Sequence, residues 1–327
     1  MKKSSILLGS IGAVGGLLGT SLGAGKLYAM KQKRSLRSLG VEKFLETFQY
    51  GPDVFDEETM KKQYKLSELP YDLPKAVTKR YGFRWMNKKA QIIDRPNKSE
   101  FVDHTIFYLH GGSYWADPNN FQFKAVATIA DKTDARVVMP VYPKAPAHHA
   151  EEVINMVVKA YATLVKTAEP KDITILGDSA GGGLALSLWE KIRELDLPRP
   201  ENIILFSPWL DLTMENPALV ESQKYDSMLN AKVLRVQGEM YAGDLKVTDP
   251  LVSPLKGDLY DLPKITIFSG THDLLYPDAE KFTKLAQENK QDVVLKTFES
   301  QGHDFAFLPI PEARKALKEA SDIILNQ

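Results

Sequence analysis

Residues 173–186 have the sequence Ile-Thr-Ile-Leu-Gly-Asp-Ser-Ala-Gly-Gly-Gly-Leu-Ala-Leu, and this stretch decides the fold. Its apolar, β-branched start predicts a buried strand, and its Ala- and Leu-rich end predicts a helix. Ser179 lies between them in a Gly-x-Ser-x-Gly turn, flanked by Gly177 and Gly181. A serine that projects from so tight a turn needs small neighbours, because helix and strand approach closely there. The order strand, turn, helix is the context of a nucleophile elbow, so we predict that Ser179 is a nucleophile.

A helix that begins directly after Ser179 would also direct its N-terminal amides and its positive dipole end towards the serine oxygen. An oxyanion that forms at this place would be stabilised by both. The alternative is that residues 177–181 form only a small-residue turn inside some other α/β protein. A base and a carboxylate for Ser179 elsewhere in the sequence would favour the nucleophile over the simple turn.

The composition is that of an ordinary globular protein, long enough to bury a core. The chain has 327 residues, of which 43% are hydrophobic and 26% are charged. Lys and Arg together number 42, as do Asp and Glu, so the formal net charge is zero and nothing indicates a nucleic-acid partner. The absence of cysteine excludes disulfides, thiolate metal sites and a cysteine nucleophile.

The first 37 residues differ from the rest of the chain. Residues 6–25 carry no charge, and these 20 residues are about the length that spans a bilayer core. Seven of them are glycine and only eight are Ile, Leu or Val, so the hydrophobicity is marginal. Two lysines precede the segment and five basic residues follow it within residues 26–37, which favours a cytoplasmic location for the rest of the chain. We therefore predict a single membrane anchor in residues 1–37; a cleaved signal that leads to secretion and a soluble leader are the alternatives.

Residues 38–327 are predicted to form one domain in which strands alternate with helices. The apolar segments predict strands at 81–85, 91–94, 105–109, 136–142, 172–176, 202–206, 265–269 and 293–298. The amphipathic segments predict helices at 41–48, 56–66, 121–130, 148–165, 180–194, 229–241, 278–288 and 311–325. This alternation implies an α/β fold with a mostly parallel central sheet and helices on both faces.

A serine nucleophile needs a base, and the base needs an orienting carboxylate. We predict that His303 is the base and Asp273 the acid, because they follow Ser179 in the order acid, then histidine. Each residue comes shortly after a predicted strand. Since the carboxyl ends of parallel strands meet at one edge of a sheet, both side chains should lie near Ser179.

Five other histidines compete with His303. His272 precedes Asp273, against the expected order. His148 and His149 begin a helix and are expected to be solvated, and His104 lies before a strand. His110 is expected to orient the loop that follows it.

Other acidic residues are weaker candidates for the triad. Asp304 neighbours His303 and would have to fold back to reach it, and Glu280 lies within a predicted helix. Asp178 lies inside the elbow, so we expect it to hold the turn by hydrogen bonds.

The sequence also offers donors for an oxyanion and walls for a pocket. We predict an oxyanion hole made of the backbone amides of Gly111, Gly112 and Ala180, since the two glycines follow a strand and Ala180 follows the nucleophile. An ordinary flexible turn is the alternative at Gly111 and Gly112. Tyr114 and Trp115 come next, and they are predicted either to wall the acyl pocket or simply to pack in the core.

With these motifs in hand, the chain resembles the α/β-hydrolases of the hormone-sensitive-lipase-like family, in the bacterial carboxylesterase branch. The resemblance covers residues from about 80 to the end. Its matching segments begin at His110 (HGGSYW), Val141 (VYPKAPAH), Gly177 (GDSAGG), Ser207 (SPWLDL), Asp249 (DP), Gly270 (GTHDLL) and Gly302 (GHDF). One departure is Ser113, where the family often has glycine or alanine, so its side chain could alter the pocket.

The resemblance implies an α/β-hydrolase fold with a helical cap made of residues 41–75 and 212–245. It also implies a serine carboxylesterase that hydrolyses short- to medium-chain acyl esters through an acyl-enzyme intermediate, with no metal and no organic cofactor. The expected partner is a small-molecule ester, besides the membrane contact of the N-terminal segment. A ligand-binding relative that has lost the chemistry and an amide or peptide hydrolase with the same triad are the alternatives. The oligomeric state stays open.

Overall fold

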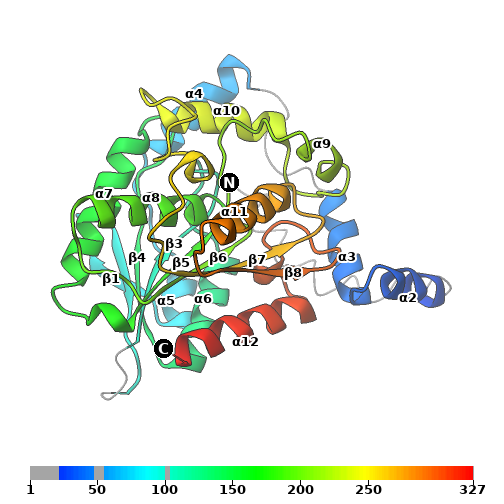
Figure 1. The fold of residues 1–327 in the computed structure, drawn as a ribbon, viewed down its shortest axis with the longest axis horizontal. Helices are drawn as coiled ribbons and strands as arrows, with labels where there is room; N and C mark the ends of the chain where they lie inside the picture. Colours follow the sequence, from blue (N-terminus) through cyan, green and yellow to red (C-terminus); the bar gives the residue numbers. More distant parts are fainter. Residues whose placement is uncertain (1–21, 48–54, 100–103, 327) are drawn as a thin grey trace.

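An eight-stranded sheet forms the centre of the molecule in a computed structural model that describes residues 22–47, 55–99 and 104–326 (Figure 1). The strand order is β1-β2-β4-β3-β5-β6-β7-β8. β1 and β2 pair antiparallel, as do β2 and β4, and all other neighbours are parallel. The strands are β1 (Arg84–Asn87), β2 (Ile92–Arg95), β3 (Thr105–Leu109), β4 (Arg136–Pro140), β5 (Ile173–Asp178), β6 (Asn202–Phe206), β7 (Lys264–Gly270) and β8 (Val293–Phe298). The predicted α/β fold with a mostly parallel sheet is confirmed.

Helices cover both faces of this sheet. α7, α8 and α11 pack on one face, and α5, α6 and α12 pack on the other (Figure 1). The helices are α2 (Leu22–Lys31), α3 (Leu36–Glu46), α4 (Glu57–Ser67), α5 (Lys75–Tyr81), α6 (Asn120–Thr133), α7 (Ala150–Leu164), α8 (Ala180–Glu194), α9 (Leu219–Ser222), α10 (Ala231–Ala242), α11 (Tyr276–Glu288) and α12 (Pro311–Leu325).

The central strands have continuous apolar sequences because both of their faces are buried. In β5, Ile173 and Ile175 belong to the core layer beneath α7 and α8, whereas Leu176 belongs to the layer beneath α6 and α12. Every residue of β5 is buried. A parallel sheet that is covered on both sides gives this kind of pattern, and it places the end of β5 deep inside the protein.

The structure differs from the sequence expectation around residues 75–85. A strand was expected at 81–85, but Lys75–Tyr81 forms α5, and β1 begins only at Arg84. Pro74 precedes the helix with φ −61°, and Gly82 ends it in the left-handed region with φ 75°. Proline at the start and glycine at the end are the usual helix boundaries, so these two residues explain why a helix stands here.

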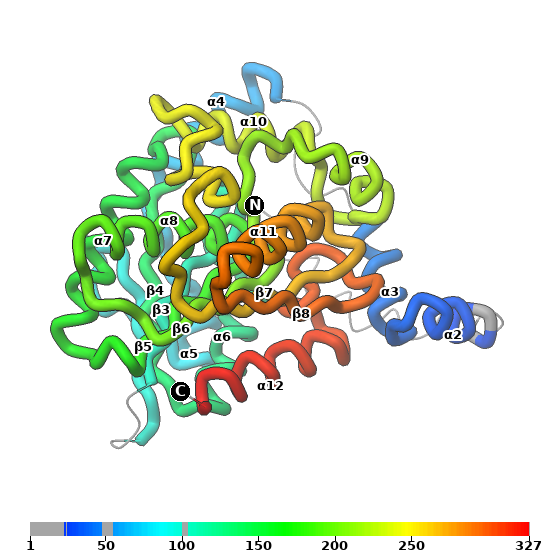
Figure 2. The backbone as a smooth tube through the Cα atoms, viewed as in Figure 1, coloured from blue at the N-terminus to red at the C-terminus, as the bar shows by residue number. Residues whose placement is uncertain are grey.

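The predicted membrane anchor lies mostly in residues 1–21, outside the described part of the chain. The described part begins with α2, which extends away from the body of the protein, whereas α3 packs against the body (Figure 2). Within residues 22–47, 55–99 and 104–326, no helix combines the length and the apolar character that a membrane crossing requires. α3 lies beside α12 and the loop after β8, although more than 250 residues separate them in the chain (Figure 2). Arg34, just before α3, binds the Ser300 carbonyl 266 positions later.

Candidate active site

The turn between β5 and α8 holds Ser179 in a strained conformation. Its φ of 50° and ψ of −121° are unusual for a residue with a side chain. Its backbone N–H donates to the Phe206 carbonyl at 2.9 Å. A Cβ on Gly177 would lie 2.4 Å from the Gly181 carbonyl oxygen, and one on Gly181 would lie 2.0 Å from the Leu109 carbonyl oxygen. Only glycine fits at these two positions, so the predicted turn geometry around Ser179 is present.

Replacing Gly181 with alanine is expected to lower the free energy of unfolding by about 3 kcal/mol or more, since the backbone oxygen of Leu109 cannot move aside. Gly40 is the matched control, because a Cβ there meets nothing within 4 Å and the residue lies inside α3. Gly40→Ala is expected to raise stability by about 0.5–1 kcal/mol. Denaturant unfolding compares the two variants with the wild type, and equal effects of both would contradict the close packing of the elbow.

The loops after β7 and β8 bring Asp273 and His303 to Ser179. His303 Nε2 lies 3.0 Å from Ser179 Oγ, and His303 Nδ1 lies 3.1 Å and 3.2 Å from the two carboxylate oxygens of Asp273. All three residues are buried. Asp273 Oδ1 also accepts a hydrogen bond from the Leu275 N–H at 2.9 Å, which fixes the carboxylate. A hydroxyl, an imidazole and a carboxylate in this order can pass a proton from the serine to the ring.

The charges around His303 favour its protonated form. Burial alone would lower the pKa of His303, but the charges of Asp304 and Asp273 raise it to about 10. Asp304 does fold back towards the ring, but it approaches Nε2, at 3.4 Å, while Asp273 contacts Nδ1. Glu280 lies on α11 and makes a contact with Tyr276 instead. Among the described residues no cluster of His, Asp and Glu is arranged to hold a metal ion.

The loop after β3 is fixed by Asp178. This buried carboxylate accepts hydrogen bonds from the Tyr108 hydroxyl at 2.6 Å, the Gln122 amide at 2.8 Å and the Gly111 N–H at 2.9 Å. The prediction that the Gly111 amide faces an oxyanion is therefore wrong in this structure, since that donor is directed at Asp178. These hydrogen bonds join Asp178 to β3, the loop after β3 and α6, and not to the elbow turn that it was expected to hold.

The backbone beyond Gly111 turns sharply. Gly112 has φ 127°, and a Cβ on it would lie 2.9 Å from the Ala116 carbonyl oxygen. Ser113 and Tyr114 follow with φ 54° and 62°. Since the Gly111 amide is engaged by Asp178, the Gly112 amide is the remaining predicted donor of this loop, beside that of Ala180 at the start of α8.

His110 supports this loop without a role in proton transfer. Its ring stacks on Tyr142 with 4.2 Å between centroids, and the Tyr142 hydroxyl donates to the His110 carbonyl. Burial lowers the pKa of His110 to about 4, so the ring is neutral near neutral pH.

The two aromatic residues after the loop pack against other elements. Tyr114 is buried and stacks on Tyr241 of α10, with 3.5 Å between ring centroids. Trp115 packs edge-on against Phe55 at 5.6 Å, and its carbonyl accepts a hydrogen bond from Gln63 of α4. Both residues therefore connect the loop after β3 to helices outside the sheet, which favours the packing alternative for Tyr114.

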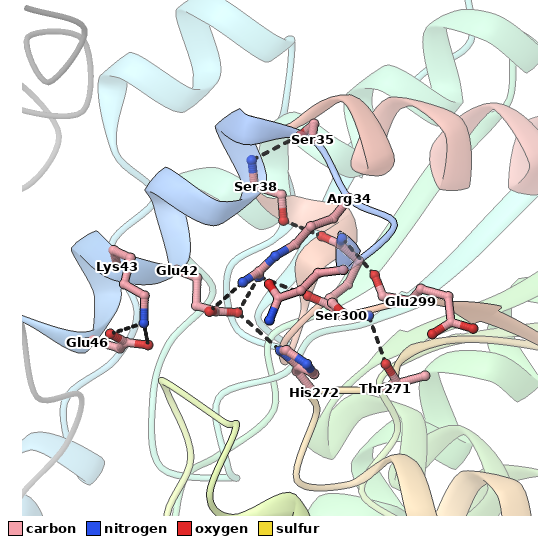
Figure 3. A network of polar contacts seen from close by, with 12 residues as sticks. Arg34, Ser35, Ser38, Glu42, Lys43, Glu46, Thr271, His272, Glu299 and Ser300 are labelled. Carbon is pink, nitrogen blue, oxygen red and sulfur yellow. Dashed lines mark hydrogen bonds and ion pairs between the residues drawn. The ribbon is translucent and has the colours of Figure 1, made fainter. Parts of the chain in front are cut away.

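The sequence did not indicate a polar cluster that joins α3 to both loops of the site (Figure 3). Arg34 donates to both oxygens of Glu42, at 2.5 and 2.8 Å, and to the Ser300 carbonyl at 3.0 Å. Glu42 also lies 3.3 Å from Nδ1 of His272, the residue before Asp273. Ser38 donates to the side chain of Gln301, two residues before His303, at 2.7 Å. We call Arg34, Ser38, Glu42 and His272 the α3 cluster.

Replacing Glu42 with glutamine is expected to lower the free energy of unfolding by about 2 kcal/mol at neutral pH, because Arg34 would stay buried without its partner. Burial raises the pKa of Glu42, but hydrogen bonds and charges of Arg34 and His272 outweigh it and lower the pKa from 4.5 to about 2. The folded-state pKa is the lower one, so this contribution is present above the unfolded value of 4.5 and is lost as the pH falls towards 2.

Urea unfolding near neutral pH and again near about pH 3.5 measures this difference. Glu46→Gln on the same helix is the control, since its exposed ion pair with Lys43 should contribute less than about 1 kcal/mol. A loss for Glu42→Gln that does not shrink at acid pH, or an equal loss for Glu46→Gln, would contradict the role of the α3 cluster.

Comparison with known proteins agrees with this fold. The sequence profile of a family described as having the alpha/beta hydrolase fold matches residues 106–307. An esterase from Acinetobacter venetianus is 33% identical over 221 residues, which cover 66% of this chain and 73% of that protein. An acetyl-hydrolase from Streptomyces hygroscopicus is 29% identical and covers the same shares of the two chains.

Solved structures show the same fold. The crystal structure of an esterase from the bacterial hormone-sensitive lipase family superposes with a TM-score of 0.73 at 23% identity. The superposition covers 90% of this chain and 99% of that one.

Proposed function

We propose that this chain, which belongs to the alpha/beta hydrolase fold family, is a serine carboxylesterase that cleaves short- to medium-chain acyl esters. The single observation that carries the proposal is the line of hydrogen-bonding distances from Ser179 Oγ through the His303 ring to Asp273. The curated relatives named esterase and acetyl-hydrolase support the reaction class.

In the first step, we propose that the neutral form of His303, whose share rises with pH, accepts the proton from Ser179 at Nε2 as the serine oxygen attacks the acyl carbon. The Gly112 and Ala180 amides stabilise the resulting oxyanion, and each such donor contributes about 2.7–4 kcal/mol to the transition state. Asp273 fixes the imidazole tautomer and stabilises its charged form. The protonated His303 then passes its proton to the leaving alkoxide, which departs as the alcohol.

In the second step, a water molecule attacks the acyl-enzyme with His303 as the base. The ester bond to Ser179 breaks, the serine recovers its proton from His303, and the carboxylic acid leaves. The sum of the two steps is one ester and one water converted to one acid and one alcohol.

The segments 41–75 and 212–245 are proposed to form a cap over this site. Support comes from a small cavity beside His303, whose apolar lining includes Val41 and Leu45 of α3 and Met228 of the second segment. Phe305 and Ile310, from the loop after His303, complete its apolar wall. A small apolar space next to the catalytic base suits short and medium chains better than long ones.

The test is turnover of chromogenic acyl esters of increasing chain length by the full chain, with Ser179→Ala measured beside it. Activity that is highest on the short and medium members supports the proposal. Specific binding of such esters without turnover would favour the ligand-binding alternative, and faster cleavage of matched anilides than of esters would favour an amide hydrolase.

Residues 1–37 are proposed to attach the protein to a membrane. Beyond the uncharged segment, α2 exposes Leu27, Tyr28 and Met30 beside basic residues, a combination that suits a lipid surface. Fractionation of cells that express the full chain, with an alkaline carbonate wash, tests this: release into the wash contradicts an integral anchor.

A further inference from the structure

Two carboxylates flank the His303 ring from opposite sides. Asp273 contacts Nδ1, and Asp304 Oδ2 lies 3.4 Å from Nε2. The same Nε2 lies 3.0 Å from Ser179 Oγ, so the nitrogen that has to accept the serine proton faces the nucleophile and a carboxylate together. The mechanism proposed above uses Asp273 and leaves Asp304 without a role.

Asp304 is held in this place by its backbone. It has φ 51° and ψ 30°, in the left-handed region, and its N–H donates to Ser207 Oγ at 3.1 Å. Its Oδ1 is buried and has no hydrogen-bond partner among the described residues. A buried carboxylate oxygen without a partner is costly to a fold, and the other oxygen of the same carboxylate, Oδ2, lies beside the reacting nitrogen, so the placement of Asp304 calls for a function.

We propose that Asp304 is a second carboxylate partner of the His303 ring, on its Nε2 side, and that it sets the pH range in which Ser179 is activated. The proposal rests on the proposed function, in which His303 is the base. An ionised Asp304 stabilises the imidazolium. It therefore keeps the His303 ring protonated up to a higher pH. It also stabilises the imidazolium that forms when Ser179 attacks.

Charged groups from every surrounding element act on this pair. Asp273 follows β7, Asp178 ends β5, and Asp226 lies on the loop after α9, where it accepts from the Leu274 N–H at 2.7 Å. From α3, Glu42 lines the same cavity as His303 but is paired with Arg34.

The charges of Asp273 and Asp226 raise the pKa of both His303 and Asp304. Burial and the charges of Asp178 and Asp273 raise the pKa of Asp304 well above its ordinary value, although the charge of His303 acts in the opposite direction. His303 and Asp304 therefore titrate as a pair, and the apparent values belong to both residues.

The experiment compares the pH dependence of kcat/KM for the full-length wild type, Asp304→Asn and Asp304→Gly. Both replacements tolerate the left-handed backbone, so neither strains the loop. Removing a charge this close is expected to shift the midpoint of the acid limb down by about 1–3 pH units. On the alkaline plateau, kcat/KM of the variants is expected to be lower than that of the wild type. This loss should be smaller than their gain in kcat/KM at low pH, because the proton is only partly transferred in the transition state. The two profiles should therefore cross.

Two outcomes overturn the proposal. One is an unchanged midpoint, and the other is a parallel loss of activity at every pH, which is what a purely structural role would give. Asp322→Asn, an exposed carboxylate on α12 that pairs with Lys318, is the matched control and should leave the profile in place.

A second measurement does not depend on turnover. Labelling the six histidines with ¹⁵N and titrating them by NMR gives the pKa of His303 directly, with His303→Gln used to assign its signal. The pKa is expected to fall in both Asp304 variants, and an unchanged value overturns the proposal. If wild type hydrolyses no ester and the His303 shift is still observed, the proposed function fails while the pairing of Asp304 with His303 stands.

Discussion

Replacing Ser179 with alanine is expected to reduce ester turnover by about a million-fold while the protein stays folded. The variant removes the Ser179 hydroxyl, which lies 3.0 Å from His303 Nε2, so no acyl-enzyme can form on this residue. It leaves the hydrogen bond from the backbone N–H of residue 179 to Phe206 in place. The β-carbon is also retained, so the strained turn does not change. Burst-phase kinetics with a chromogenic ester measures both the acylation step and the steady-state rate.

Ser187→Ala is the matched control for this variant. Ser187 lies on α8, the helix that follows Ser179, and is buried. Its hydroxyl lies within hydrogen-bonding distance of the Gly183 and Leu251 carbonyls, away from the site. Its loss should affect stability modestly and leave kcat within a few-fold of the wild-type value. Equal turnover by wild type and Ser179→Ala would mean that another residue is the nucleophile.

Replacing Asp273 with asparagine is expected to lower kcat by about 10⁴-fold at neutral pH. An amide of the same shape keeps an acceptor for the Leu275 N–H, so the loop after β7 should stay in place. It no longer stabilises the imidazolium, and it can present an N–H to Nδ1, which leaves the ring in the wrong tautomer. kcat measured across the pH range, together with circular dichroism to monitor the fold, tests this expectation.

Asp304→Asn provides the comparison for Asp273→Asn, since the two carboxylates flank the same ring. Asp273→Asn should be slow at every pH, whereas Asp304→Asn should exceed the wild type at low pH and fall below it at high pH. Similar pH profiles for both variants would mean that the two carboxylates act alike on the ring. That would contradict the different contacts of Asp273 with Nδ1 and of Asp304 with Nε2.

The local sequence predicted much of this arrangement. Gly177 and Gly181 predicted the turn around Ser179, because close packing of a strand and a helix excludes any side chain at these two positions. Asp273 and His303 followed from their order in the chain and from their positions after two apolar strands. These signals are local, so a single sequence contains them.

Other parts of the site depend on contacts between segments far apart in the chain. Arg34 and Glu42 look like ordinary exposed charges until α3 packs on the loops after β7 and β8. The Gly111 amide was expected to face the substrate, and only the orientation of Asp178, 67 residues later, shows that it is already engaged. Asp304 was a weaker candidate because it would have to fold back to reach its neighbour His303, and its left-handed backbone is what brings it to Nε2.

The α3 cluster also joins parts of the chain that are synthesised far apart in time. Arg34 leaves the ribosome 266 residues before Ser300, the carbonyl that it binds. At the usual rates of translation this delay is on the order of tens of seconds. Over that interval Arg34 can pair with Glu42, only 8 residues away, but not with the loops that it supports in the finished protein. The contacts of Arg34 with the loop after β8, and of Glu42 with the loop after β7, can therefore form only late in the synthesis of the chain.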